Sequence, residues 1–158
     1  MTNYICINGK KAELTEEQLK ALGIELPKAS PFERVEHGGG YYVIDRCGEV
    51  LQAYEWQDDL DDKAFNAGNY CADQSIMEQR ALHETLNRLL WRYSMEHKAE
   101  SHSPCDIYYN GNLEKWGYRY AGSDSHYLSP VFDSPEIALN AIEEIAMPFM
   151  KAHPEFKW

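Results

Sequence analysis

A long amphipathic helix is the pattern that most restricts how this chain can fold. Apolar side chains recur at intervals of four, three and four residues, at Leu82, Leu86, Leu89 and Tyr93. These intervals place them on one face of an α-helix. The pattern predicts a helix over residues 73–97, with Ser75 and Glu78 as a capping box at its start. Because one apolar face needs a cover, the flanking segments must pack against it.

Short strand-like runs separated by turn residues lie on both sides of this helix. Residues 41–45 and 49–56 surround the sequence Arg46-Cys47-Gly48, and residues 105–110 and 113–121 surround Gly111. Each pair predicts a β-hairpin. The helix and the hairpins together predict an α+β fold, in which small antiparallel sheets are each packed by a helix.

Both ends of the chain carry further helix signals. Residues 1–26 read as a hairpin that turns at Asn8-Gly9, followed by a short helix capped by Thr15 and Gln18, with Leu19 and Leu22 on its buried side. After a short strand over residues 127–132, Ser134 and Pro135 start a second amphipathic helix, which Pro148 is expected to kink or end.

The order of these elements is partly repeated. Residues 41–97 and 105–152 both run hairpin, irregular segment, helix, and the junction over residues 69–73 can be overlaid on residues 130–134. We therefore expect one domain over residues 1–158, with an N-terminal part (1–26), a first ββα lobe (41–97) and a second ββα lobe (105–152). The two lobes would form a degenerate two-fold repeat.

Composition and charge restrict the partners. The chain has 158 residues, 44% hydrophobic, and a net charge of −11. A negative field repels phosphate backbones and anionic lipid headgroups, so we expect neither direct nucleic-acid binding nor membrane binding. The first residues show no secretory signal, and the four cysteines form no Cys-x-x-Cys pair. Because Cys6, Cys71 and Cys105 have apolar or aromatic neighbours, we expect buried free thiols in a reducing cytoplasm.

An acidic run is the first candidate interaction site. Carboxylates occupy four of five consecutive positions, at Asp58, Asp59, Asp61 and Asp62. The spacing lacks the glycine and the glutamate of a helix–loop–helix calcium site, so we assign no metal. We interpret the run as a solvated acidic loop, with contact to a basic protein partner as the functional alternative.

Three alternating aromatic residues, Trp116, Tyr118 and Tyr120, are the second candidate. Their strand spacing favours packing beneath a helix, while Tyr and Trp are also typical of protein interfaces. The sequence has no serine nucleophile elbow, no phosphate-binding glycine loop and no His-Glu-x-x-His motif. We therefore predict no catalytic residues, no cofactor and no enzyme activity.

Several strings spread over the chain carry a family resemblance. They are Ile7-Asn8-Gly9-Lys10-Lys11, Leu14-Thr15-Glu16-Glu17-Gln18-Leu19, Tyr41-Tyr42-Val43-Ile44-Asp45, Gly48-Glu49-Val50, Phe65-Asn66-Ala67-Gly68-Asn69-Tyr70, Leu89-Leu90-Trp91-Arg92-Tyr93-Ser94-Met95-Glu96 and Pro148-Phe149-Met150. The chain resembles a family of small bacteriophage and prophage accessory proteins of gut bacteria, which has no agreed activity. The resemblance implies an accessory gene product that acts inside an infected or lysogenic bacterium. Cys71 replaces the aromatic residue typical of that family.

The leading hypothesis is a non-enzymatic accessory protein that acts through protein–protein contacts. In its sharper form, the acidic chain inhibits a basic nucleic-acid-binding host or defence protein. One alternative is a virion or assembly component that oligomerises. Another is a metal-dependent hydrolase built on the acidic run. The sequence defines neither the partner nor the oligomeric state.

Overall fold

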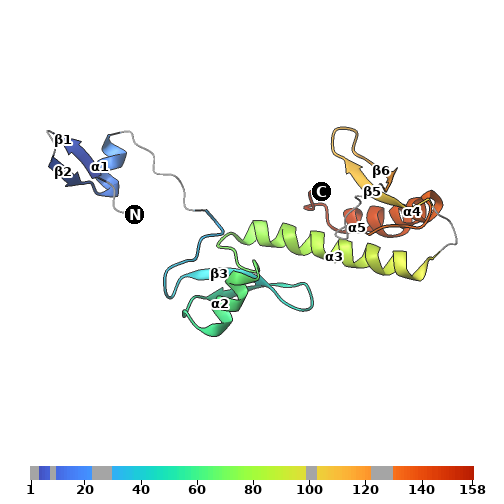
Figure 1. The fold of residues 1–158 in the computed structure, drawn as a ribbon, viewed down its shortest axis with the longest axis horizontal. Coiled ribbons are helices and arrows are strands. Elements are labelled where there is room, and N and C mark those ends of the chain that lie inside the picture. The colour runs from blue at the N-terminus through green and yellow to red at the C-terminus, as the bar shows by residue number, and fades with distance from the viewer. Residues whose placement is uncertain (1–3, 8–9, 23–29, 99–102, 122–129) are drawn as a thin grey trace. The chain divides into compact units, whose positions relative to one another are not determined.

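The fold is α+β, with three two-stranded antiparallel sheets and a set of helices among the residues that the structure describes. The structure is a computed structural model that describes residues 4–7, 10–22, 30–98, 103–121 and 130–158 (Figure 1). The chain divides into two compact units, Met1–Glu33 and Arg34–Trp158. This division differs from the single domain expected from sequence. Arg34, the first residue of the larger unit, forms ion pairs with Glu55 and Asp62.

The smaller unit holds a hairpin and a short helix. Strand β1 (Tyr4–Ile7) pairs with β2 (Lys10–Glu13), and helix α1 (Glu16–Ala21) follows. The predicted capping box is confirmed: the Gln18 N–H donates to Thr15 Oγ1 at 3.3 Å, and the Thr15 N–H donates to Gln18 Oε1 at 2.9 Å. Leu19 is buried but Leu22 is exposed, so its predicted burial is wrong. The predicted turn at Asn8-Gly9 lies outside the described residues.

In the larger unit, strand β3 (Gly40–Ile44) pairs with β4 (Val50–Tyr54), and helix α2 (Asp59–Asn66) follows. The hairpin has two covered faces. Ile44 packs with Cys71, Met77 and Ala81 on one face, while the Tyr41 hydroxyl reaches Asp61 of α2 on the other. Because α2 covers the second face, the Asp61 carboxylate of the acidic run lies inside the protein.

Helix α3 (Gln74–Glu96) is the predicted long helix, and two separate cores share it. Its N-cap is Asp73 rather than the predicted Ser75, since Asp73 Oδ1 accepts from the Ser75 N–H at 2.9 Å. Met77 and Ala81 pack against β3 and β4, whereas Leu86, Leu90 and Tyr93 join the core farther along the chain. Because the two cores divide α3 between them, the lobes of the structure differ in their bounds from those expected from sequence. From here on, the first lobe is residues 34–81 and the second lobe is residues 82–158 (Figure 1).

The second lobe has strands β5 (Cys105–Asn110) and β6 (Lys115–Tyr120), followed by a continuous helix. That helix consists of α4 (Pro135–Ala141), the π-helical segment η1 (Ile142–Ala146) and α5 (Met147–Ala152). Ser134 caps it as predicted. Pro148 has no N–H and crowds the preceding turn. The helix nevertheless continues to Ala152, with a wider turn directly before the proline.

Apolar side chains fill the interior of the second lobe. Fully or almost fully buried members are Leu86, Leu90, Cys105, Phe132, Ala138, Ala141, Ile142, Ala146, Phe149 and Phe156. Within the predicted strand 127–132, residues 127–129 lie outside the described residues, and Phe132 forms a single antiparallel bridge with Cys105. This bridge fastens the start of α4 to the sheet.

The C-terminal segment is tied to α3 by side chains that bond to its backbone. The Gln79 amide donates to the Glu155 carbonyl and accepts from the Lys157 N–H, both at 2.8 Å. His83 Nε2 lies 2.7 Å from the Lys157 carbonyl. Phe156 is buried between these anchors. In the described part of the chain, no helix is both long enough and apolar enough to cross a membrane.

Candidate functional site

A buried carboxylate lies at the centre of the first lobe. The side chain of Glu55 has no exposed surface. Arg34 donates two hydrogen bonds to this carboxylate, from Nε to Oε2 at 3.0 Å and from Nη2 to Oε1 at 2.9 Å. The Tyr70 hydroxyl donates to Oε2 at 2.9 Å. These donors hold the pKa of Glu55 below its ordinary value, with the Arg34 hydrogen bond as the largest cause, so the carboxylate is charged at neutral pH.

The backbone N–H of Gln57 is a further donor to the Glu55 carboxylate. Gln57 has a positive φ of 59°, a conformation that costs a non-glycine residue energy. Its N–H donates to Glu55 Oε1 at 2.8 Å. The left-handed turn therefore brings a donor back to the buried carboxylate and points the chain into α2.

A second carboxylate, Asp61, is also buried. It accepts from the Tyr41 hydroxyl at 2.5 Å and from the Trp56 N–H at 2.7 Å. The first of these bonds is the largest cause that holds the pKa of Asp61 below its ordinary value. The pKa of Tyr41 is raised, mainly by desolvation and then by its bond to Asp61. Both groups keep the charge states that the hydrogen bond requires.

Two stacked tyrosines connect these carboxylates. The rings of Tyr41 and Tyr70 have centroids 4.0 Å apart and planes inclined by 17°. Tyr41 comes from β3 and donates to Asp61, whereas Tyr70 precedes α3 and donates to Glu55. The sheet, α2 and the start of α3 are therefore joined by one polar network.

An open cavity of about 420 Å³ lies beside this network. Its walls include Tyr41, Tyr54 and Trp56, and its acidic lining residues are Asp58 and Asp61. Tyr54, Trp56 and Leu60 are largely exposed. Aromatic faces attract cations, and a neighbouring carboxylate adds to that attraction. The cavity therefore has the chemistry to receive a lysine or arginine side chain.

The acidic run itself is not the loop expected from sequence. Asp58 is the N-cap of α2 and accepts from the Leu60 N–H at 2.8 Å. Asp59 is exposed in the first turn, and Asp62 accepts from Arg34 Nη1 at 2.6 Å. Carboxylates near a helix N-terminus are stabilised by the helix dipole, which explains why an acidic stretch folds here as a helix. The interpretation as a solvated loop is wrong.

The aromatic candidates lie in the second lobe, apart from the acidic run in the fold. Trp116 is buried and Tyr118 packs against the same core, whereas Tyr120 is exposed. Burial of Trp116 agrees with the packing interpretation, and exposure of Tyr120 does not. The two sets of candidates do not form one site.

Sequence reasoning missed four members of the polar network: Arg34, Tyr41, Glu55 and Tyr70. Arg34 lies between the predicted N-terminal part and the first predicted hairpin, and Glu55 lies in the predicted strand 49–56. Their contacts join residues 15 to 21 positions apart. No local spacing marks such a pairing, and only the folded chain brings these side chains together.

Metal ligands do not gather in the described part of the chain, where no group of three or more His, Cys, Asp or Glu side chains is placed to hold an ion. The oxygens of Glu55 and Asp61 accept hydrogen bonds from protein donors. Cys71 and Cys105 are buried free thiols, as their apolar and aromatic neighbours in the sequence predicted, and Cys47 is an exposed free thiol.

Comparison with known proteins gives no relative from which a role can be taken. Protein-family models, curated protein sequences and solved structures were all compared with the chain, and none of the three gives a significant match. The functional argument therefore rests on the chemistry of the two lobes.

Proposed function

We propose that this protein is a non-enzymatic accessory protein that binds another protein through the first-lobe cavity. The observation that carries the proposal is the combination of exposed Trp56 and Tyr54 with the carboxylates of Asp58 and Asp61 around one opening. Tryptophan and tyrosine dominate the energetics of protein interfaces. The exposed carboxylate of Asp58 contacts a cationic side chain of the partner, and the buried charge of Asp61 adds to its attraction.

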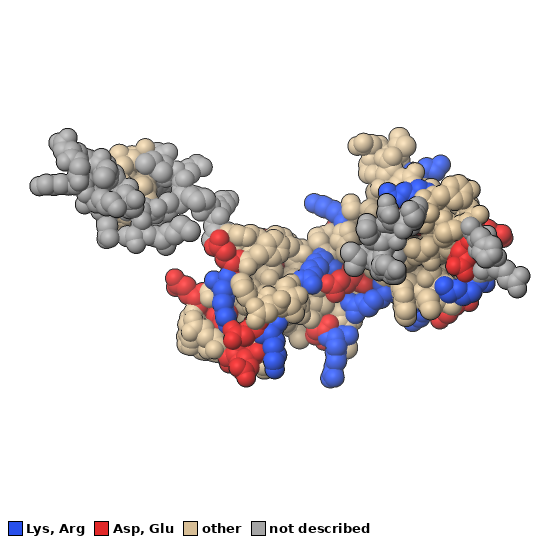
Figure 2. Space-filling view, in the orientation of Figure 1, with Lys and Arg blue, Asp and Glu red and all other residues tan. Residues whose placement is uncertain are grey.

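The distribution of charge supports a basic partner. Acidic side chains gather over the part of the molecule that contains α2 (Figure 2). Asp58, Asp59 and Asp62 are all exposed there, and the whole chain carries a net charge of −11. Such a surface steers a basic protein toward the cavity. In the sharper form of the proposal, the partner is a basic nucleic-acid-binding host or defence protein in a phage-infected or lysogenic bacterium.

The buried network gives the cavity a rigid floor. The Asp61 carboxylate accepts from the Tyr41 hydroxyl and from the backbone N–H groups of Trp56 and Asp58, and Tyr41 is stacked on Tyr70. A preorganised carboxylate binds a cation with a smaller loss of side-chain freedom than a mobile one. The same network keeps both buried carboxylates ionised, which suits charge recognition better than proton transfer.

The test pairs two exposed tryptophans. Trp56 is 59% exposed beside the cavity and Trp91 is 58% exposed on α3, outside the residues that line it. Tagged protein is used to capture partners from bacterial lysate, and a captured protein is then purified and its affinity measured by calorimetry. We expect Trp56→Ala to weaken binding at least tenfold, whereas Trp91→Ala leaves it unchanged.

A charge variant separates recognition from folding. Asn is as good an N-cap as Asp, so Asp58→Asn removes a charge while it keeps the cap. We expect this variant to bind more weakly, and high salt to reduce the difference from the parent. Equal affinity of Trp56→Ala, Trp91→Ala and the parent protein for the purified partner would contradict the proposal.

A role in assembly is the second candidate, favoured by exposed apolar residues on the second lobe. Trp91 and Met95 lie on α3, and Leu139 and Met147 lie on the C-terminal helix. Exposed apolar surface of this kind promotes self-association. A monomer in light scattering at high concentration would count against this candidate.

A further inference from the structure

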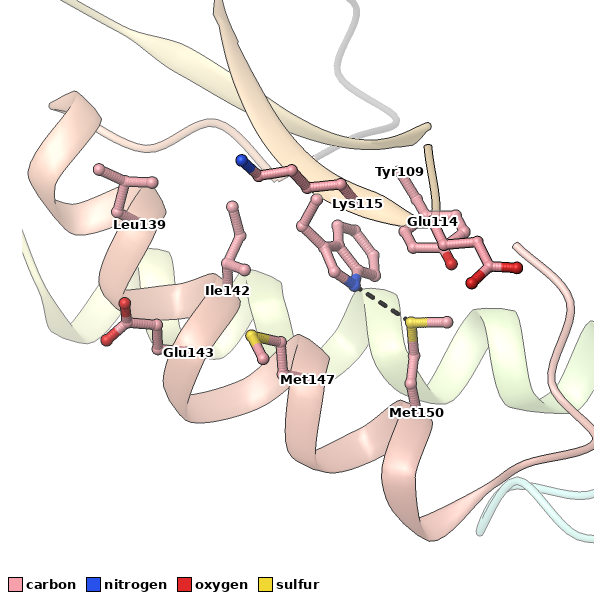
Figure 3. A pocket seen from close by; sticks show the side chains of 9 residues that line it. Tyr109, Glu114, Lys115, Leu139, Ile142, Glu143, Met147 and Met150 are labelled. Atoms are coloured by element: carbon pink, nitrogen blue, oxygen red, sulfur yellow. Dashed lines mark hydrogen bonds between the residues drawn. The ribbon is translucent and has the colours of Figure 1, made fainter. Parts of the chain in front are cut away.

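The second lobe has a cavity of its own, with a volume of about 460 Å³. It opens between the turn end of the β5–β6 hairpin and the helix formed by α4, η1 and α5 (Figure 3). Tyr109 and Trp116 form the sheet side, and Leu139, Met147 and Met150 lie on the helix side. Pockets that bind small molecules have volumes of roughly 300–1,000 Å³ and are mostly apolar. This cavity meets both criteria.

A buried donor in this cavity has a weak acceptor. Trp116 is only 9% exposed, and its indole N–H lies 3.1 Å from the thioether sulfur of Met150 (Figure 3). Buried indole N–H groups usually find a hydrogen-bond partner, and a thioether is a poor one. An oxygen atom on a ligand would form a stronger bond than the sulfur does. The indole therefore marks where a polar atom of a ligand belongs.

The helix side of the cavity is adaptable. Methionine side chains are unbranched and polarisable, so Met147 and Met150 can adjust to the shape of a ligand. Ile142 and Glu143, which also line the cavity, belong to the π-helical segment η1. Such wide turns occur often at functional sites because they shift side chains out of the regular helical positions.

The charged lining residues restrict the ligand. Glu114, Lys115 and Glu143 contribute two carboxylates and one ammonium group. This balance disfavours an anionic ligand such as a fatty acid. Lys115 offsets one of the two carboxylates, whereas the described residues that line the first-lobe cavity include no Lys or Arg, so this cavity attracts a cation less. A neutral ligand fits these surroundings best.

We infer that this cavity binds a small, neutral, mainly apolar molecule that carries a carbonyl oxygen. The apolar body lies against Trp116, Leu139 and Met147, and the carbonyl oxygen accepts from Trp116 Nε1 in place of the Met150 sulfur. This site is independent of the proposed function, because it lies in the other lobe and selects a neutral ligand rather than a cationic side chain.

The test uses 2-acetylnaphthalene as the probe and the whole chain as the protein. Binding is followed by NMR through the indole N–H signals of the four tryptophans. We expect saturable binding in which the Trp116 signal shifts most. We also expect the probe to bind about fivefold more tightly than 2-ethylnaphthalene, which lacks the oxygen. A neutral hydrogen bond typically changes an affinity by about this factor.

Matched methionine variants locate the site. Met147 is 54% exposed on the cavity wall, and Met95 is 50% exposed on α3 and does not line the cavity. Met147→Glu should weaken binding of the probe at least tenfold, and Met95→Glu should not change it. Because both residues are half-exposed, neither substitution requires a charge in the core.

Two further variants test the hydrogen bond. Trp116→Phe removes the donor and should abolish the preference for the ketone over 2-ethylnaphthalene. Met150→Leu removes the competing sulfur and should increase that preference, which a merely structural defect would not do. Absence of saturable binding, equal affinity for the two naphthalenes, or equal loss in Met147→Glu and Met95→Glu would each overturn the inference.

Discussion

The two lobes join hairpin to helix with the same local arrangement. In the first lobe, Cys71 bridges to Tyr42 of β3 and Asp73, two residues later, caps α3. In the second lobe, Phe132 bridges to Cys105 of β5 and Ser134, again two residues later, caps α4. These are the positions that the sequence overlay aligns. The two-fold repeat as a whole stays a prediction, because the bridge is made by Tyr42 in the middle of β3 but by Cys105 at the start of β5.

Inside this shared frame, the lobes are stabilised by different chemistry. The first lobe buries two carboxylates and two hydrogen-bonded tyrosines around Arg34. The second lobe buries a continuous apolar core that includes Leu90, Phe132 and Phe149 and, among the described residues, a single buried carboxylate, Asp106, which pairs with Arg119. Apolar burial stabilises in proportion to area, whereas buried charges offset much of their attraction by desolvation. We therefore expect the second lobe, with the larger apolar core, to supply most of the stability, and the first lobe to hold charge at a fixed position.

Truncation of the second-lobe core should have the largest effect. Phe132 is fully buried and fastens α4 to β5. Phe132→Ala removes this contact area and leaves a cavity, so we expect the free energy of unfolding to fall by about 3–5 kcal/mol in urea denaturation. Leu139→Ala, at a half-exposed position on the same helix, is the control and should cost far less. Similar losses in both variants would contradict an apolar core centred on Phe132.

Removal of the buried charge should have the next largest effect, confined to the first lobe. Glu55→Gln takes the counter-charge from Arg34 and replaces one acceptor oxygen with a donor facing the existing donors. We expect faster amide hydrogen exchange in β3 and β4 than in the parent, with β5 and β6 unchanged. The double variant Arg34→Leu/Glu55→Leu should recover much of the protection, because a paired apolar replacement leaves no unpaired buried charge. Equal acceleration in both sheets would remove the distinction between the lobes.

Local patterns were enough to predict most of the elements of both lobes. The spacing of Leu82, Leu86 and Tyr93 predicted α3, and Ser134-Pro135 predicted the start of α4. These signals act within one or two helical turns, where propensity and capping decide the structure. The acidic run was wrongly predicted to be a loop, because few of its residues are apolar and no helical apolar pattern marks α2. Asp58 caps that helix.

The sites depend on contacts that no local pattern contains. Glu55 and Arg34 are ordinary surface residue types, and only the fold places them in one buried pair. Likewise, Trp116 was a core candidate from its strand spacing, but its pairing with Met150 joins residues 34 positions apart. The second cavity depends on that pairing and on the π-helical turn before Pro148, a turn that the proline alone did not predict.

The smallest of the expected effects is a difference between the two lobes in how their amide protection responds to mild acid. Four carboxyls with lowered pKa values, Asp45, Glu55, Asp61 and Asp73, belong to the first lobe. A carboxyl whose pKa is lowered by folding stabilises the protein above its unfolded pKa, near 4.5 for Glu and 3.8 for Asp, and this contribution disappears as pH falls toward the folded value. As the pH falls from about 5 to about 3, through the unfolded pKa values of these groups, we therefore expect amide protection, corrected for the intrinsic exchange rate, to decrease first in β3 and β4. The loss should be smaller in Glu55→Gln, in which one of the four groups no longer titrates. If β5 and β6 instead lose protection at a higher pH than β3 and β4 do, the charge network does not determine the acid sensitivity of the first lobe.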